Sequence, residues 1–176
     1  MTERRILIAG IGNIFFGDDA FGVEVARSLA KREMPPAVRV IDFGIRGIDL
    51  AYSLSEGWDL VILVDAVRRG GKPGTVYLIE PEGTDNAKPA ATVEPHALDP
   101  WRVLGLARSL GGNMGRVLLV GCEPATLESV DGSMELTEPV KAAVPEAIRL
   151  LDSLVNDILL QRQFEKRCPW YGSANT

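Results

Sequence analysis

Five short apolar segments, most of them continuously apolar, constrain the fold of this chain more than any other feature of its sequence. They cover residues 5–9, 38–42, 60–65, 75–79 and 116–120. Strands that are covered by helices on both faces have continuous apolar sequences, whereas strands with one face in water alternate apolar and polar residues. The five segments therefore predict the strands of a sheet that is buried on both faces.

Apolar residues at helical spacing lie between and after these strands. They are Phe21, Val25, Ala26 and Leu29 in one segment, Leu98, Val103, Leu106 and Leu110 in another, and Val140, Val144, Ala147, Ile148, Leu151, Leu154, Val155 and Ile158 in the last. Thr137 is expected to cap the last helix, and Pro145 is expected to kink it. Strands that alternate with helices predict an α/β fold, a three-layer α/β/α sandwich with a mostly parallel sheet of about five strands.

The connection between the third and fourth strands is an exception to this alternation. Its sequence, AVRRGGKPG at residues 66–74, is too short for the helical crossover that joins parallel strands. The fourth strand is therefore expected to run antiparallel to the others.

Chain length and charge narrow the class of protein. The 176 residues suit one domain, which we expect to cover residues 1–164, and residues 165–176 are expected to form a flexible tail. A formal net charge of −5 disfavours nucleic acid as a partner. Because no apolar segment approaches the roughly 20 residues that cross a bilayer, we expect a cytoplasmic protein with no membrane partner.

The two cysteines, Cys122 and Cys168, lack the spacing of a zinc site, and Cys122 is expected to be a buried apolar residue.

A glycine-rich turn follows the first strand, in the sequence AGIGNIFFGDDAFG. Gly10 and Gly12 begin a dinucleotide-binding pattern, but Phe15 stands where the third glycine belongs, and no Walker-type Gly-Lys-Ser/Thr follows. Asp18 and Asp19 would also repel a phosphate. Two interpretations of this acidic pair remain open: one aspartate caps the following helix, or one is a ligand for a cation.

Asp65 and His96 are candidates for the same site as Asp19. Asp65 ends an apolar strand, and ligands bind beyond the carboxyl ends of parallel strands in such sheets. The loop at residues 80–95 is long enough to return the only histidine to that edge. Two carboxylates and one imidazole suit zinc, nickel or manganese, although ordinary polar roles, such as a capping Asp65, remain the alternative.

The ordered set of these segments resembles the nickel–iron hydrogenase maturation endopeptidases, which process the hydrogenase large subunit. The matching segments are ILIAGIGNIFFGDDAFGVEV, VILVDAV, PGTVYLIE, EPHALDP and VGCEPATLE. The resemblance implies a phosphorylase/hydrolase-like single protease domain, a monomer, and removal of a short C-terminal extension from a nickel-loaded precursor. It also implies that Asp19, Asp65 and His96 contact the nickel, which the precursor supplies.

The resemblance leaves the chemistry open. Asp19 and Asp65 are the candidate catalytic residues; either the ion activates water or polarises the scissile carbonyl, or an aspartate acts as general base. Asp18 is a weaker candidate for the nickel site. The alternatives to a protease are a non-catalytic nickel-binding or metallochaperone-type module and a nucleotide-binding α/β domain.

The resemblance also implies which residues shape the cleft. After the second predicted strand, this chain departs from the sequence that is common in the family. The residues expected to shape the cleft are Gly10, Gly12, Asn13, Gly44 and Gly47. Where the family commonly has DGGT, this chain has DFGIRG. Arg46 in that stretch either pairs with a carboxylate of the substrate or is a solvated residue at the start of a helix.

Overall fold

The computed structural model describes residues 4–80, 99–127 and 134–167 and contains five strands and four α-helices in that part of the chain. The elements in chain order are β1 (Ile6–Ile11), the 3-10 helix η1 (Gly17–Ala20), α1 (Phe21–Leu29), β2 (Val38–Gly44), α2 (Gly47–Leu54), β3 (Leu60–Ala66), β4 (Val76–Ile79), α3 (Pro100–Ser109), β5 (Arg116–Cys122) and α4 (Glu138–Arg167). Each of the five predicted strands is present.

The strands form one sheet in the order β2-β1-β3-β5-β4. The pairs β1/β2, β1/β3 and β3/β5 are parallel, and β4 pairs antiparallel with β5. The predicted mostly parallel sheet and its antiparallel fourth strand are both confirmed. The carboxyl ends of the four parallel strands consequently lie at one edge of the sheet, which we call the carboxyl edge.

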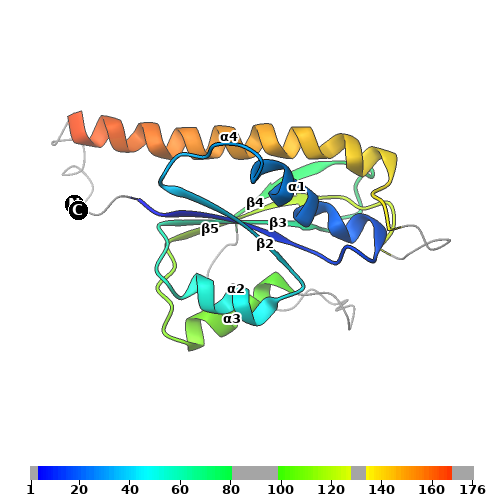
Figure 1. Ribbon diagram of the computed structural model, residues 1–176, viewed down its shortest axis with the longest axis horizontal. Helices are drawn as coiled ribbons and strands as arrows, with labels where there is room; N and C mark the ends of the chain where they lie inside the picture. Colours follow the sequence, from blue (N-terminus) through cyan, green and yellow to red (C-terminus); the bar gives the residue numbers. More distant parts are fainter. Residues whose placement is uncertain (1–3, 81–98, 128–133, 168–176) are drawn as a thin grey trace.

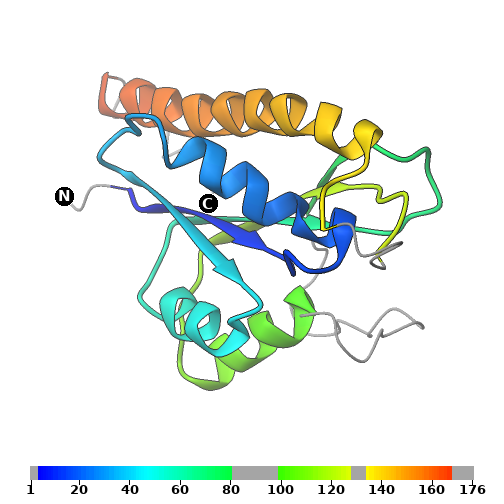
Figure 2. The ribbon, with the colours of Figure 1, turned by 45° about the vertical axis from the view of Figure 1, so that its right-hand side comes forward.

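Helices cover both faces of the sheet (Figures 1 and 2), as the continuous apolar strands predict. Successive residues of β1 point to opposite faces: Ile6 and Ile8 pack in one core with α1 and α4, and Leu7 and Ala9 pack in the other with α2 and α3. The predicted three-layer α/β/α sandwich is therefore confirmed.

Three local features refine the sequence predictions. The pattern search missed α2, a helix of eight residues that buries only Leu50, Ala51 and Leu54. Thr137 directly precedes α4 and accepts the first helical hydrogen bond, from the Lys141 amide at 2.8 Å, so its predicted cap position is confirmed. The α4 helix runs through Pro145 and ends at Arg167, three residues inside the predicted tail, and the rest of that tail lies outside the described residues.

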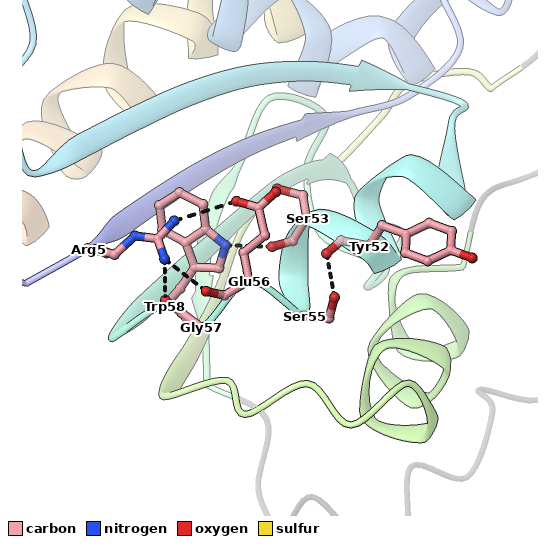
Figure 3. A network of polar contacts seen from close by, with 7 residues as sticks. All are labelled: Arg5, Tyr52, Ser53, Ser55, Glu56, Gly57 and Trp58. Atoms are coloured by element: carbon pink, nitrogen blue, oxygen red, sulfur yellow. Dashed lines mark hydrogen bonds and ion pairs between the residues drawn. The ribbon is translucent and has the colours of Figure 1, made fainter.

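The edge opposite the carboxyl edge is held by a network around Arg5 (Figure 3). Its guanidinium lies 4.4 Å from the Trp58 ring centroid and donates hydrogen bonds to the carbonyls of Glu56 at 2.8 Å and Gly57 at 3.1 Å. The Trp58 indole N–H in turn donates to the Ser53 carbonyl at 2.7 Å. These contacts attach the segment between α2 and β3 to the start of β1. In the three described stretches, no helix combines the length and apolarity that crossing a membrane requires.

Candidate active site at the carboxyl edge

The glycine-rich turn places η1 directly beyond the carboxyl end of β1. Gly12 has φ +138°, and a Cβ built on it would lie 1.8 Å from the Asp19 carbonyl oxygen, so only glycine fits there. The Gly12 amide donates to the Gly44 carbonyl at 3.1 Å, which joins this turn to the end of β2. A Cβ on Gly10 would lie 2.3 Å from the Gly22 carbonyl oxygen, so Gly10 allows α1 to pack closely on β1. Three of the predicted cleft-shaping glycines therefore form this corner.

Asp19 lies in η1 and is partly buried. One of its carboxylate oxygens accepts a hydrogen bond from the Asn13 amide at 2.9 Å. Burial raises the pKa of the Asp19 carboxyl, and the Asn13 hydrogen bond opposes that change. Asn13 therefore orients Asp19, and its part in shaping a cleft stays a prediction.

Asp65 lies on β3, one residue before its end, and is 7% exposed. Within the described chain it accepts one hydrogen bond, from its neighbour's amide at Ala66, at 2.9 Å. Burial raises the pKa of the Asp65 carboxyl well above its usual value, and the negative charge of Asp19 raises it further. The structure thus brings Asp19 and Asp65 together at the carboxyl edge.

Asp99 is a third acidic residue near this pair, and the sequence analysis did not identify it. It caps α3, accepting a hydrogen bond from the Trp101 amide at 2.9 Å, and its charge also contributes to the raised pKa of Asp65. The available signal was the sequence Asp-Pro at the start of a helical pattern, which is typical of an N-cap followed by proline.

His96, the third predicted nickel contact, lies outside the described residues. Among residues 4–80, 99–127 and 134–167, no group of three or more His, Cys, Asp or Glu side chains is arranged to hold a metal ion. The described part of the predicted metal site consists of Asp19 and Asp65.

Asp18 has a different role from its neighbour Asp19. Its carboxylate is fully buried and accepts four hydrogen bonds: from the amides of Ala125, Thr126 and Thr137 at 2.8, 3.1 and 2.7 Å, and from the Thr137 hydroxyl at 2.9 Å. We call this cluster the Asp18 joint. It fixes η1 to the segment after β5 and to the start of α4.

Two interpretations of the acidic pair are corrected by these contacts. Neither aspartate caps α1, because the helix begins after Ala20 and receives no side-chain capping hydrogen bond. The weaker assignment of Asp18 to the nickel site is not supported, because both of its oxygens accept bonds from protein donors.

Glu123 is a third buried carboxylate, after Asp18 and Asp65, and the sequence analysis did not single it out. It accepts hydrogen bonds from the amides of Arg69 at 2.8 Å and Gly70 at 3.2 Å and from the Tyr77 hydroxyl at 2.9 Å. Burial alone would raise the pKa of Glu123, but the bonds from Arg69, Tyr77 and the loop glycines together lower it. Glu123 therefore holds the loop between β3 and β4.

The neighbouring Cys122 is fully buried, which confirms its predicted role as an apolar residue. Burial, with the nearby acidic groups, raises the pKa of its thiol to about 12. A thiol in this state is a poor nucleophile, so Cys122 is not a candidate for catalysis.

The DFGIRG segment connects β2 to α2. Arg46 precedes α2; its guanidinium donates to the Phe43 carbonyl at 3.1 Å and to the Asp42 carbonyl, and lies 3.6 Å from the Asp49 carboxylate. The exposed Arg46 at the start of a helix is confirmed, and a contact with substrate stays a prediction. Gly44, with φ +54°, and Gly47, the first residue of α2, complete this corner.

Comparisons with known proteins identify the family of this chain. The family model described as hydrogenase maturation protease matches residues 23–153. The hydrogenase expression/formation protein HoxM of Azotobacter vinelandii is 36% identical over 151 residues, which are 85% of this chain and 72% of that protein.

Two solved structures share the fold. The hydrogenase maturating endopeptidase HybD of E. coli has a TM-score of 0.72 at 29% identity, covering 87% of this chain and 93% of that chain. The [NiFe] hydrogenase maturation protease HycI of Thermococcus kodakarensis has a TM-score of 0.66 at 28% identity, covering 86% and 92%. The family model and the HoxM relative, together with these shared folds, show that the chain belongs to the hydrogenase maturation protease family.

Proposed function

We propose that this protease removes a short C-terminal extension from the nickel-loaded precursor of a hydrogenase large subunit and recognises the nickel that the precursor carries. The observation that carries this proposal is the pair Asp19 and Asp65 at one edge of the sheet. Asp19 is partly buried, Asp65 is buried, and the pKa values of both carboxyl groups are raised. Perturbed carboxyl groups of this kind are typical of functional sites.

A divalent cation would compensate the negative charges of this pair. Each carboxylate accepts one hydrogen bond in the described chain, and the charge of Asp19 disfavours ionisation of Asp65. A nickel ion presented by the precursor would relieve this repulsion, since carboxylate and imidazole ligands suit nickel. In the proposal the precursor's own ligands complete the coordination, so two carboxylates and one histidine suffice here.

His96 is the imidazole in this proposal. It is three residues before Asp99, and three residues span at most about 11 Å of chain. Because the charge of Asp99 acts on Asp65, this covalent limit supports a contribution of His96 to the same site.

Two hydrolytic routes are compatible with these groups, and both add water across the scissile peptide bond to give a carboxylate and an amine. In one, the precursor's nickel polarises the scissile carbonyl or activates the water. In the other, Asp65 or Asp19 takes a proton from the water as general base, a role that a raised carboxyl pKa favours near neutral pH. The matched protein of Thermococcus kodakarensis is itself described as a [NiFe] hydrogenase maturation protease, which supports a nickel–iron enzyme as the substrate.

The test is incubation of the full chain with nickel-loaded and nickel-free precursor, followed by mass spectrometry of the large subunit. We expect loss of a C-terminal peptide only from the nickel-loaded form. Cleavage of both forms would contradict nickel recognition, and binding without cleavage would favour the non-catalytic nickel-binding or metallochaperone-type module.

A variant series assigns the residues. We expect His96→Ala to abolish processing without changing the thermal unfolding of the protein. Asp157→Asn is the matched control, because Asp157 is an exposed carboxylate on α4. Full activity of His96→Ala would remove His96 from the mechanism.

A further inference from the structure

A surface groove of about 440 Å³ lies next to the turn that carries Asp19. Its apolar lining comes from two segments far apart in the sequence: Ile14 and Ala20 around η1, and Met134, Leu136, Val144 and Pro145 at the start of α4. We call it the η1–α4 groove. In Figures 1 and 2, η1 and the start of α4 lie at the same end of the molecule.

The groove and the candidate active site share one rigid segment. Ile14 and Ala20, which line the groove, lie on either side of Asp19 in the same turn. The Asp18 joint bonds this turn to Thr137, directly before α4, at 2.7 and 2.9 Å. The position of the groove relative to Asp19 is therefore fixed by buried hydrogen bonds.

Large apolar side chains at the groove are exposed to water. Ile14 and Met134, both in the lining, are 36% and 54% exposed. Aromatic residues and methionine are enriched at the centres of protein interfaces. A cavity of this volume lies in the range of ligand sites, about 300–1,000 Å³.

The charged lining residues indicate what the groove binds. Glu24, Glu135 and Lys141 line the groove, and the Arg27 guanidinium lies 3.5 Å from the Glu24 carboxylate, so charges of both signs are present there. A lining of mixed charge lacks the concentrated positive charge that binds a phosphate or another small anion. An apolar or neutral stretch of polypeptide fits both the apolar walls and this charge.

We propose that the η1–α4 groove binds apolar side chains of the C-terminal extension that is removed from the precursor. This inference rests on the proposed function, because the extension must pass Asp19 to be cleaved. The groove holds only a few side chains, which suits a short peptide better than the folded body of the large subunit. It gives the protease a contact with the substrate that is separate from the nickel.

Two substitutions test the groove in the full chain. We expect Ile14→Ser and Met134→Ser each to raise KM for the nickel-loaded precursor about tenfold and to leave kcat within twofold, because these contacts bind ground state and transition state alike. Leu110→Ser is the control: Leu110 is 45% exposed and follows α3, before β5 begins at the opposite edge, and we expect no change in KM. An unchanged KM in both groove variants, with normal thermal unfolding, would overturn the proposal.

Photo-crosslinking identifies the occupant without requiring cleavage. The variant Ile14→p-benzoylphenylalanine is irradiated with the nickel-loaded precursor, and the adduct is mapped by mass spectrometry. We expect the adduct within the C-terminal extension, and none from Leu110→p-benzoylphenylalanine. Adducts only with the folded body of the precursor, only with a second copy of this chain, or with neither would overturn the proposal. If the wild-type chain cleaves the nickel-loaded precursor but no adduct forms in the extension, the groove assignment is wrong and the proposed function stands. If the adduct forms in the extension but the wild-type chain cleaves no precursor, the proposed function is wrong and the groove assignment stands.

Discussion

The Asp18 joint and the Asp19–Asp65 pair contain the same functional group in the same part of the molecule, yet the structure treats them in opposite ways. Asp18 is fully buried and its two oxygens accept four hydrogen bonds. Asp19 and Asp65 each accept one within the described chain, and their pKa values are raised. A buried carboxylate with enough donors stabilises the fold, whereas one with too few favours a proton or a cation.

Glu123 belongs with Asp18 in this comparison. It is buried at the same edge, but amide and hydroxyl donors compensate its burial and lower its pKa. Burial of an acidic side chain therefore does not identify the functional residues of this protein. The number of donors around each carboxylate is what separates Asp19 and Asp65, the proposed functional residues, from Asp18 and Glu123.

The largest expected effect is the loss of processing in Asp19→Asn and Asp65→Asn. We expect each variant to cleave nickel-loaded precursor about a thousandfold more slowly, since loss of a general base or a transition-state charge contact costs this much. Single-turnover cleavage measures the rate. Activity within tenfold of wild type in either variant would show that the carboxylate is dispensable for the chemistry.

The second effect is a loss of stability in Asp18→Asn. The amide group replaces one acceptor oxygen with a donor that faces backbone N–H groups, and we expect the free energy of unfolding to fall by about 3 kcal/mol. Urea denaturation monitored by circular dichroism gives this value. An Asp18→Asn variant as stable as wild type would contradict the structural role of the joint.

The third effect is a difference between Glu123→Gln and Asp65→Asn in how the free energy of unfolding depends on pH. Because the folded-state pKa of Glu123 is lowered below 4.5, its stabilising contribution is present above that pH and is lost as the pH falls through the folded-state pKa. We expect Glu123→Gln to lower the free energy of unfolding by about 2 kcal/mol at pH 7 and by much less near pH 3.

For Asp65 the dependence of stability on pH has the opposite sign. Its folded-state pKa is raised above 3.8, so its contribution to stability is present below that pH and is lost as the pH rises through the folded-state pKa. Asp65→Asn is therefore expected to be at least as stable as wild type at pH 7, with the difference vanishing near pH 3. If both variants were destabilised in parallel at every pH, the distinction between the two kinds of carboxylate would be wrong.

The smallest expected effect is that of Thr137→Val, which removes one of the four donors to Asp18 and keeps the side-chain shape. We expect a loss of about 1 kcal/mol in the free energy of unfolding, compared with about 3 for Asp18→Asn. The double variant tests coupling: a loss well below the sum of the two single losses is expected for residues in one network. Strictly additive losses would contradict a direct Thr137–Asp18 bond.

The sequence by itself determined the strands, the mostly parallel sheet and the antiparallel β4. These features follow from local information: the period of apolar residues and the length of one connection. It also placed Asp65 at a strand end, on the edge where ligands bind. The short α2 was missed because eight residues with three buried side chains give a weak periodic signal.

Only the tertiary structure decided which of the adjacent aspartates is structural. The donors to Asp18 come from residues 107 to 119 positions away, and no local pattern reports them. The same is true of Glu123, whose amide donors lie 53 and 54 positions away, and of the charge of Asp99 on Asp65. Burial and hydrogen bonding depend on segments that meet only after folding, so the sequence identified Asp18, Asp19 and Asp65 as candidates, whereas the structural role of Asp18 and the contributions of Glu123 and Asp99 appear only in the folded chain.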